Sequence, residues 1–162
     1  RQMCIRDSYI KDAMGIDPAT AVMTSNFIGD ALEMCRELGF RGALLIGHIG
    51  KLVKLAGGMW NTHSRYGDCR TDILTACAAA EGLGAAAAEE LLRCATCDDA
   101  LRILQEQGLY EAVLHRLAGR IDDMMHYKCS DIETGAILFS KEYGYLCETK
   151  DAAALLRRIK ED

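Results

Sequence analysis

The chain has little of several features that would assign it to a particular class of protein. Its 162 residues include one proline and only 6% aromatic residues, while half of them are hydrophobic. A chain of this length and composition forms one domain with a substantial core and is not intrinsically disordered. No apolar run approaches the roughly 18 residues of a membrane span, so we expect no membrane partner. The net charge of −5 argues against a nucleic-acid surface, and any anion site must therefore be local.

A disulfide framework is also not indicated, although the chain has eight cysteines. They fall mostly within apolar helical patterns rather than in loops, and no secretory leader is recognisable. We therefore predict free thiols in a reducing cytoplasm. The spacings Cys94-x-x-Cys97 and His126-x-x-Cys129 are similar to those of zinc ligands. The two pairs are 28 residues apart and lie in different helical patterns, so we predict buried thiols and no metal site.

The amino end, "RQMCIRDS", has no hydrophobic periodicity. We predict that residues 1–8 are a non-native or disordered leader. Residues 9–162 are then expected to form one carboxyl-terminal α/β domain. Only three or four strands are recognisable in it, which is thin for a complete sheet, so we expect the sheet to be truncated on its amino-terminal side.

Short apolar runs alternate with helical patterns along the rest of the chain, which favours a parallel sheet flanked by helices. Residues 21–23 and 42–46 are predicted strands, the second of them central in the sheet, and residues 48–56 are the predicted helix after it. Thr24, Ser25 or Asn26 is expected to cap a helix that ends at Gly39. Near the carboxyl end, "GAILFS" and "YLCE" are predicted strands on either side of the turn "KEYG".

The stretch from Leu44 to Arg65 contains the most distinctive chemistry, although it is not a phosphate loop. The pattern G-x-x-x-x-G-K-[ST] fails because its first and last positions would be Leu45 and Leu52. On a helical wheel, His48, Lys51 and Lys54 share the face opposite the apolar residues. A strand, a glycine turn and a basic helix face together indicate an anion site at the carboxyl end of a strand. A solvated basic helix face explains the same pattern equally well.

Four segments resemble one protein family. They are "SNFIG" at 25–29, "GHIGKLVKLAGG" at 47–58, "NTHSR" at 61–65 and "AILFS" at 136–140. In them the sequence is similar to the cobalt-precorrin-5B C(1)-methyltransferases of anaerobic cobalamin biosynthesis, called CbiD. The resemblance covers roughly residues 20–162, which would be the carboxyl-terminal half of a family member.

The resemblance implies transfer of a methyl group from S-adenosylmethionine, the cofactor, to a ring carbon of a polycarboxylated cobalt corrinoid. It implies a catalytic residue, His63, which could accept a proton or, as we prefer, orient a carboxylate. Because "TSN" and "GH" directly follow predicted strands, six residues are expected to converge on one concavity at the carboxyl ends of the strands: Ser25, Asn26, His48, Lys51, His63 and Ser64. The candidates other than His63 are expected to bind the substrate. They are Ser25, Asn26, His48, Lys51, Lys54, Asn61, Thr62, Ser64 and Arg65. Two questions stay open: whether identical subunits assemble, and whether the chain is instead a non-catalytic tetrapyrrole- or anion-binding module.

Overall fold

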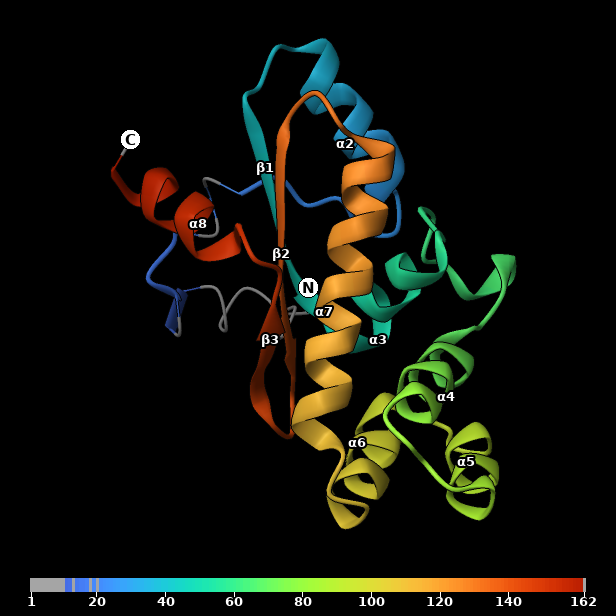
Figure 1. Cartoon of the computed structure of the whole chain (residues 1–162). Helices are drawn as coiled ribbons and strands as arrows, with labels where there is room; N and C mark the ends of the chain where they lie inside the picture. Colours follow the sequence, from blue (N-terminus) through green and yellow to red (C-terminus); the bar gives the residue numbers. More distant parts are fainter. Residues whose placement is uncertain (1–10, 13, 18, 20, 162) are drawn as a thin grey trace.

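The computed structural model describes residues 11, 12, 14–17, 19 and 21–161, so the predicted leader at 1–8 lies outside the described residues (Figure 1). The chain contains both helices and strands, as the apolar patterns predicted, but they do not alternate throughout, because a run of helices separates the first described strand from the second. In chain order the elements are α2 (Ile28–Glu37), β1 (Gly42–His48), α3 (Ile49–Leu52), the 3₁₀ helices η2 (Val53–Gly57) and η3 (Ser64–Tyr66), α4 (Arg70–Ala80), α5 (Ala85–Leu92), α6 (Cys97–Glu106), α7 (Tyr110–Lys128), β2 (Glu133–Ser140), β3 (Gly144–Glu148) and α8 (Ala152–Glu161).

The predicted α/β class is confirmed, but the described sheet is not wholly parallel. Its order is β1-β2-β3. β1 and β2 are parallel, from the pair Gly42 and Glu133 to the pair His48 and Phe139, whereas β2 and β3 are antiparallel. The short connection between β2 and β3 explains this, because a tight turn can join only antiparallel neighbours.

Two strand predictions are wrong. β1 is an edge strand of the described sheet, and the central strand is β2. Residues 21–23 form no strand, and the side chain of Val22 is 86% exposed. Strand order depends on pairing between segments far apart in sequence, which an apolar run by itself does not reveal.

The sheet lies between two helical layers (Figure 1). α8 covers one face, where Ile137 and Ala152 are buried together with Met14. α7 covers the other face, and its buried residues Val113 and Ile121 belong to the larger core. α8 approaches the sheet closely at Gly135, where an added Cβ atom would lie 2.9 Å from the Cα atom of Ala152. A glycine is therefore needed at this contact between layers.

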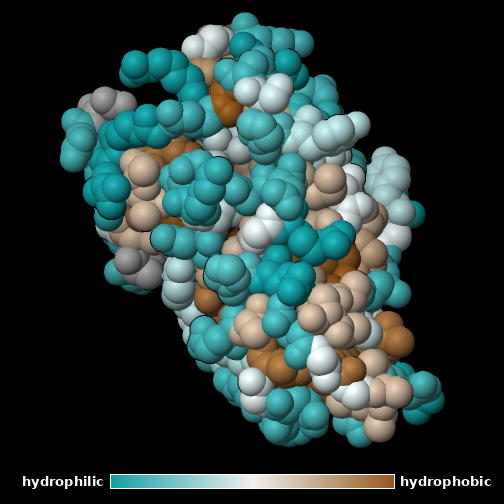
Figure 2. All heavy atoms as spheres, in the orientation of Figure 1, coloured by the Kyte–Doolittle hydropathy of each residue, from teal (hydrophilic) through white to brown (hydrophobic). Residues whose placement is uncertain are grey.

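Helices α4, α5 and α6 form a lobe beside the sheet (Figure 1). Apolar residues gather at the lower right of the space-filling view, over this lobe (Figure 2). Within the lobe, α6 begins with a capping box, in which the side chains of Thr96 and Asp99 each accept the other residue's backbone N–H.

The helix predicted at 48–56 is divided into the four-residue α3 and the 3₁₀ helix η2. The predicted side-chain cap of α2 is also absent. The N-cap residue is Phe27, which makes no side-chain cap bond, and the side chain of Asn26 bonds elsewhere. The end of α2 at Gly39, which has a φ of +75°, agrees with the prediction.

The seven described cysteines are free thiols. Cys97 and Cys129 are buried, whereas Cys94 is partly exposed. Among the described residues, no three His, Cys, Asp or Glu side chains lie close enough to hold a metal ion. Within the same residues, no helix has both the length and the apolar character to cross a membrane.

Candidate functional site

Two of the segments that sequence analysis singled out lie against each other. The turn before α2 and the loop after η2 form an isolated antiparallel bridge between Phe27 and Asn61. The N–H of Gly29 donates to the carbonyl of Trp60 at 3.0 Å. The approach is close, because a Cβ atom on Gly29 would lie 2.8 Å from the Cβ atom of Trp60. We call residues 24–29 together with residues 60–67 the turn–loop junction.

Side chains extend the junction. The Thr62 hydroxyl donates to the Asn26 side-chain oxygen at 3.3 Å, and the Thr62 N–H donates to the Asn26 carbonyl at 3.0 Å. Lys51 on α3 donates from its Nζ to the Ser25 carbonyl at 3.3 Å. The structure thus brings together five predicted binding residues: Ser25, Asn26, Lys51, Asn61 and Thr62.

Ser25 has a strained backbone. Its φ of +51° is the one positive value outside glycine among the described residues. A serine in the left-handed region costs of order 1 kcal/mol or more, and such strain is concentrated at sites of binding and catalysis. The Lys51 ammonium group bonds to the carbonyl of this residue, so the basic side chain and the strained turn are directly connected.

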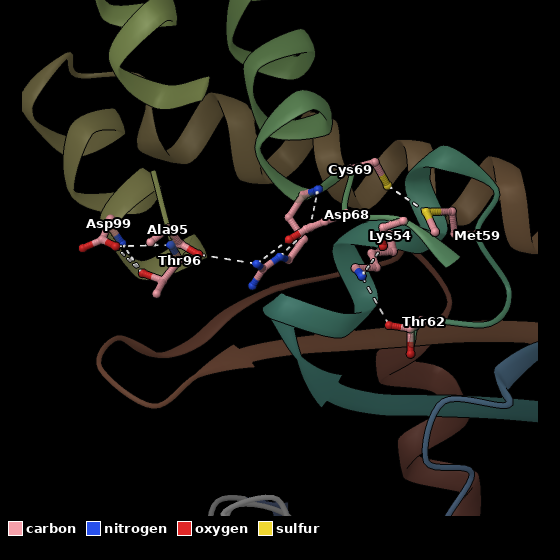
Figure 3. A network of polar contacts seen from close by, with 10 residues as sticks. Lys54, Met59, Thr62, Asp68, Cys69, Ala95, Thr96 and Asp99 are labelled. Atoms are coloured by element: carbon pink, nitrogen blue, oxygen red, sulfur yellow. Dashed lines mark hydrogen bonds and ion pairs between the residues drawn. The ribbon is translucent and has the colours of Figure 1, made fainter. Parts of the chain in front are cut away.

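Lys54 does not share an exposed basic face with Lys51, and that prediction is wrong. Its side chain is buried, with only 3% exposed. The Nζ atom donates to the carbonyl oxygens of Thr62 at 3.3 Å and Gly67 at 3.0 Å (Figure 3). The aliphatic stem lies in the core while the charged end reaches loop carbonyls. Lys54 therefore fixes the two ends of the loop 62–67 and is not available as a surface cation.

His48 and His63 have the same local arrangement. Each is the N-cap of a short helix, and each accepts a backbone N–H at Nδ1 over 3.1 Å, from Gly50 and from Arg65 respectively. With Nδ1 acting as an acceptor, the neutral ring carries its proton on Nε2. Both rings therefore offer an N–H donor. This arrangement favours the orienting role for His63 over the proton-accepting role.

The environments of these two histidines differ. His48 is half-buried at the end of β1, and the edge of its ring contacts Phe139, with centroids 5.9 Å apart. Burial lowers the pKa of His48, an effect partly opposed by the charge of Asp98. His63 is exposed on the loop. Because its pKa is lowered by burial, His48 is neutral near pH 7.

Arg65 and Ser64 lie on the exposed part of the loop. The Arg65 guanidinium stacks on Tyr66, with its Cζ atom 4.7 Å from the ring centroid, and donates to the Tyr66 hydroxyl at 2.6 Å. Sequence reasoning missed Tyr66. An aromatic residue directly after "NTHSR" was the signal that could have identified it.

A second missed feature follows the loop (Figure 3). Arg70 binds both carboxylate oxygens of Asp68, at 2.7 and 2.6 Å, and reaches the carbonyl of Ala95 in the α4–α6 lobe at 3.4 Å. The side-chain hydrogen bond from Arg70 lowers the pKa of Asp68 to about 2. The Cys69 thiol lies 3.0 Å from the sulfur of Met59. These contacts join the end of the loop to the lobe.

The predicted concavity at the carboxyl ends of the strands, formed by Ser25, Asn26, His48, Lys51, His63 and Ser64, stays a prediction. A shallow hollow of about 420 Å³ lies at the other end of α2, but none of the predicted site residues lines it. Its lining is mostly acidic and includes the ion pair of Arg36 with Asp131. The candidate site is therefore the turn–loop junction with the donors beside it.

Comparison with known proteins identifies similar sequences. The model of a protein family described as "CbiD, C-terminal domain" matches residues 61–150. A protein of Listeria welshimeri named cobalt-precorrin-5B C(1)-methyltransferase is 31% identical over 152 residues, covering 92% of this chain and 41% of the relative. Relatives with the same name from Klebsiella pneumoniae and Photorhabdus laumondii are 33% and 34% identical. They cover 94% and 83% of this chain, and 41% and 36% of their own lengths. No solved structure matches the chain.

Proposed function

Because the chain belongs to the CbiD family, we propose that it forms part of an S-adenosylmethionine-dependent C-methyltransferase that acts on cobalt-precorrin-5B in cobalamin biosynthesis. The names of the relatives support this reaction. The chain spans about two fifths of the length of those relatives. The proposed activity is therefore that of the longer protein, to which this chain contributes a binding surface.

The surface we assign to the corrinoid is the turn–loop junction. One observation carries this assignment: the pairing of residues 25–29 with residues 60–62 places amide and hydroxyl groups beside the Lys51 ammonium group. The corrinoid carries many carboxylates, and ammonium and N–H donors bind carboxylates through charge-assisted hydrogen bonds. Lys51 and the Nε2–H groups of His48 and His63 supply such donors.

The roles that follow concern binding and orientation. Lys51 binds a substrate carboxylate, and His63 orients one from the exposed loop. Lys54 acts on the substrate only through the loop that it fixes, so it is a positioning residue. Methylation of a ring carbon requires that donor and acceptor be held in line at close approach. A loop anchored at both ends is suited to that task, because its donors lose little conformational freedom when the substrate binds.

The carboxylate that directly follows the loop, Asp68, is not open to the methyl donor. A nucleoside ribose is commonly held by a carboxylate that accepts hydrogen bonds from its hydroxyl groups. Asp68 directly follows the loop, but Arg70 already occupies both of its carboxylate oxygens. We therefore assign no residue of this chain to S-adenosylmethionine, which supplies the methyl group in the reaction we propose.

The single tryptophan of the chain, Trp60, provides the test. It lies within the junction, and a bound corrin would quench its fluorescence. We expect cobyrinic acid, a cobalt corrin with free carboxylates, to quench Trp60 saturably. Cyanocobinamide, whose carboxylates are amides, should bind more weakly. Equal affinity for the two corrins, or no saturable quenching, would refute the assigned surface.

A separate assay tests the reaction. The longer family protein should transfer radiolabelled methyl from S-adenosylmethionine to cobalt-precorrin-5B, and this chain by itself should bind a corrin without turnover. Corrin binding without methyl transfer by the longer protein would favour the tetrapyrrole-binding module instead.

A further inference from the structure

The apolar side of α2 is wider than the part of it that the described residues cover. At about 100° per residue, Phe27, Met34 and Leu38 fall in one narrow stripe along the helix. Ile28 and Leu32 lie beside this stripe and are buried in the core. The stripe itself is not covered: Phe27, Met34 and Leu38 are 54%, 58% and 70% exposed.

The charged side of α2 already has partners. Glu33 pairs with Lys128 at the end of α7, and Arg36 pairs with Asp131 at 2.7 Å. The burial of Ile28 and Leu32 in the core fixes how the helix is rotated on the domain, and these ion pairs agree with that rotation. Because the rotation is fixed, the exposed stripe cannot turn inward, and it faces away from the domain. Phe40, which is 56% exposed, extends the apolar surface toward β1.

α2 contacts β1, which is at the edge of the described sheet. Within the described residues β1 pairs only with β2, so the N–H and C=O groups of its other edge have no strand partner there. Proteins usually protect such an edge with charged residues, proline or a bulge. The seven residues GALLIGH contain no proline and no Lys, Arg, Asp or Glu, and their pairing with β2 is regular throughout. An unprotected strand edge and an exposed apolar stripe on the helix that contacts this strand are both typical of a surface that another part of a protein covers.

We propose that this surface, the α2 stripe together with the outer edge of β1, is the docking site for the amino-terminal portion of the longer CbiD chain. That portion would add a strand to β1 and place apolar side chains on Phe27, Met34 and Leu38. The proposal rests on family membership and does not depend on the proposed substrate.

Two facts favour this occupant over a second copy of the chain. The relatives are more than twice as long as their match to this chain, since the match covers 41% of the Listeria welshimeri protein. The match to the family's carboxyl-terminal domain begins at residue 61. α2 and β1 therefore lie on the amino-terminal side of that match, where the chain is closest in sequence to the missing portion.

The rate of methionine oxidation by dilute hydrogen peroxide measures how accessible the α2 stripe is to solvent. Met34 on the stripe is 58% exposed, whereas Met125 in α7 is fully buried and serves as an internal control. The oxidation rates are compared between this chain and a fusion. In the fusion, the portion of the Listeria welshimeri relative that precedes its match is joined to the amino end of this chain. Amide hydrogen exchange of β1 is followed in the same two proteins.

In the fusion, we expect Met34 to oxidise at least about tenfold more slowly and the β1 amides to become protected, because both are then buried. Met125 should stay slow in both proteins. The substitution Leu38→Lys, which puts a charge into the stripe, should restore fast oxidation of Met34 in the fusion. Glu37→Lys, on the charged side of the same helix, should not.

Unchanged Met34 oxidation and β1 exchange in the fusion would overturn the proposal. It would also be overturned if Met34 in this chain became protected as its concentration rose and sedimentation showed a dimer that Leu38→Lys dissociates. That result would identify a second copy as the occupant.

Discussion

The Nζ atom of Lys54 lies 3.0 Å from the carbonyl oxygen of Gly67, and both ends of the loop 62–67 depend on this one buried ammonium group. Surface lysines seldom determine the shape of a loop. Lys54 does so because its side chain is buried and its Nζ atom donates to carbonyl oxygens at both ends of the loop.

Replacing Lys54 with methionine should therefore destabilise the fold. Methionine fills a similar volume but leaves the carbonyls of Thr62 and Gly67 without their donor, at about 1–3 kcal/mol for an unsatisfied buried group. Urea unfolding monitored by circular dichroism measures the loss. Lys51→Met is the matched control, and its more exposed hydrogen bond should be worth about 1 kcal/mol or less. Equal losses would mean that Lys54 does not anchor the loop.

Lys51→Gln should weaken corrin binding rather than stability. A charge-assisted hydrogen bond is worth about 1.5–3 kcal/mol and a neutral one about 1, so affinity for cobyrinic acid should fall about tenfold. The Trp60 quenching titration measures this change. The difference between Lys51→Gln and the unsubstituted chain should shrink as salt is raised, because part-exposed charges are screened. An unchanged affinity would remove Lys51 from the site.

His48 should make stability depend on pH. Its folded-state pKa is lowered by burial, so below the unfolded value of about 6.5 the unfolded chain binds a proton that the folded chain does not. Stability should therefore fall as pH drops from 7 through 6.5 and stop falling below the folded-state pKa. His48→Asn keeps a side-chain cap but cannot titrate. The free energy of unfolding of the two proteins, measured between pH 5 and 7, should diverge toward acid. Parallel curves would contradict the prediction.

Gly29→Ala should disturb the turn–loop junction. The added methyl group would lie 2.8 Å from the Cβ atom of Trp60, and overpacking of this kind costs about 1–3 kcal/mol. The emission of Trp60 should shift as its surroundings change. In contrast, Gly119→Ala in α7 has open space around it and should stabilise the protein by up to about 1 kcal/mol. A harmless Gly29→Ala would show that the approach of the two segments is not tight.

The local elements were the most predictable part of this fold. The apolar runs at 42–46 and 135–140 predicted β1 and β2, and the turn after Ser140 predicted the β2–β3 hairpin, because these signals are contained in short stretches of sequence. The edge position of β1, in contrast, depends on the pairing of segments far apart in the sequence, because β1 and β2 are separated by more than 80 residues.

The candidate site was predictable only in part, because sequence motifs identify residues but not the contacts between distant segments. Asn26 and Thr62 were singled out from their motifs, but their hydrogen bond joins residues 36 positions apart. Lys54 was wrongly predicted to be exposed, because a helical wheel shows the direction of a side chain but not which other segments cover it. The loop that covers its ammonium group comes from residues 62–67, outside the helix.

The bridge between Phe27 and Asn61 has a consequence for gene engineering. Residue 61 is where the match to the family's carboxyl-terminal domain begins, yet the backbone of that first matched residue is paired with a turn that lies 34 positions upstream. A cassette cut at residue 61 and moved into another protein would leave behind Asn26 and Lys51, two of the groups that shape the junction. Recombination between relatives should preserve corrin recognition only when the crossover lies upstream of residue 24. The segment that can be exchanged is therefore longer than the segment that the family model matches.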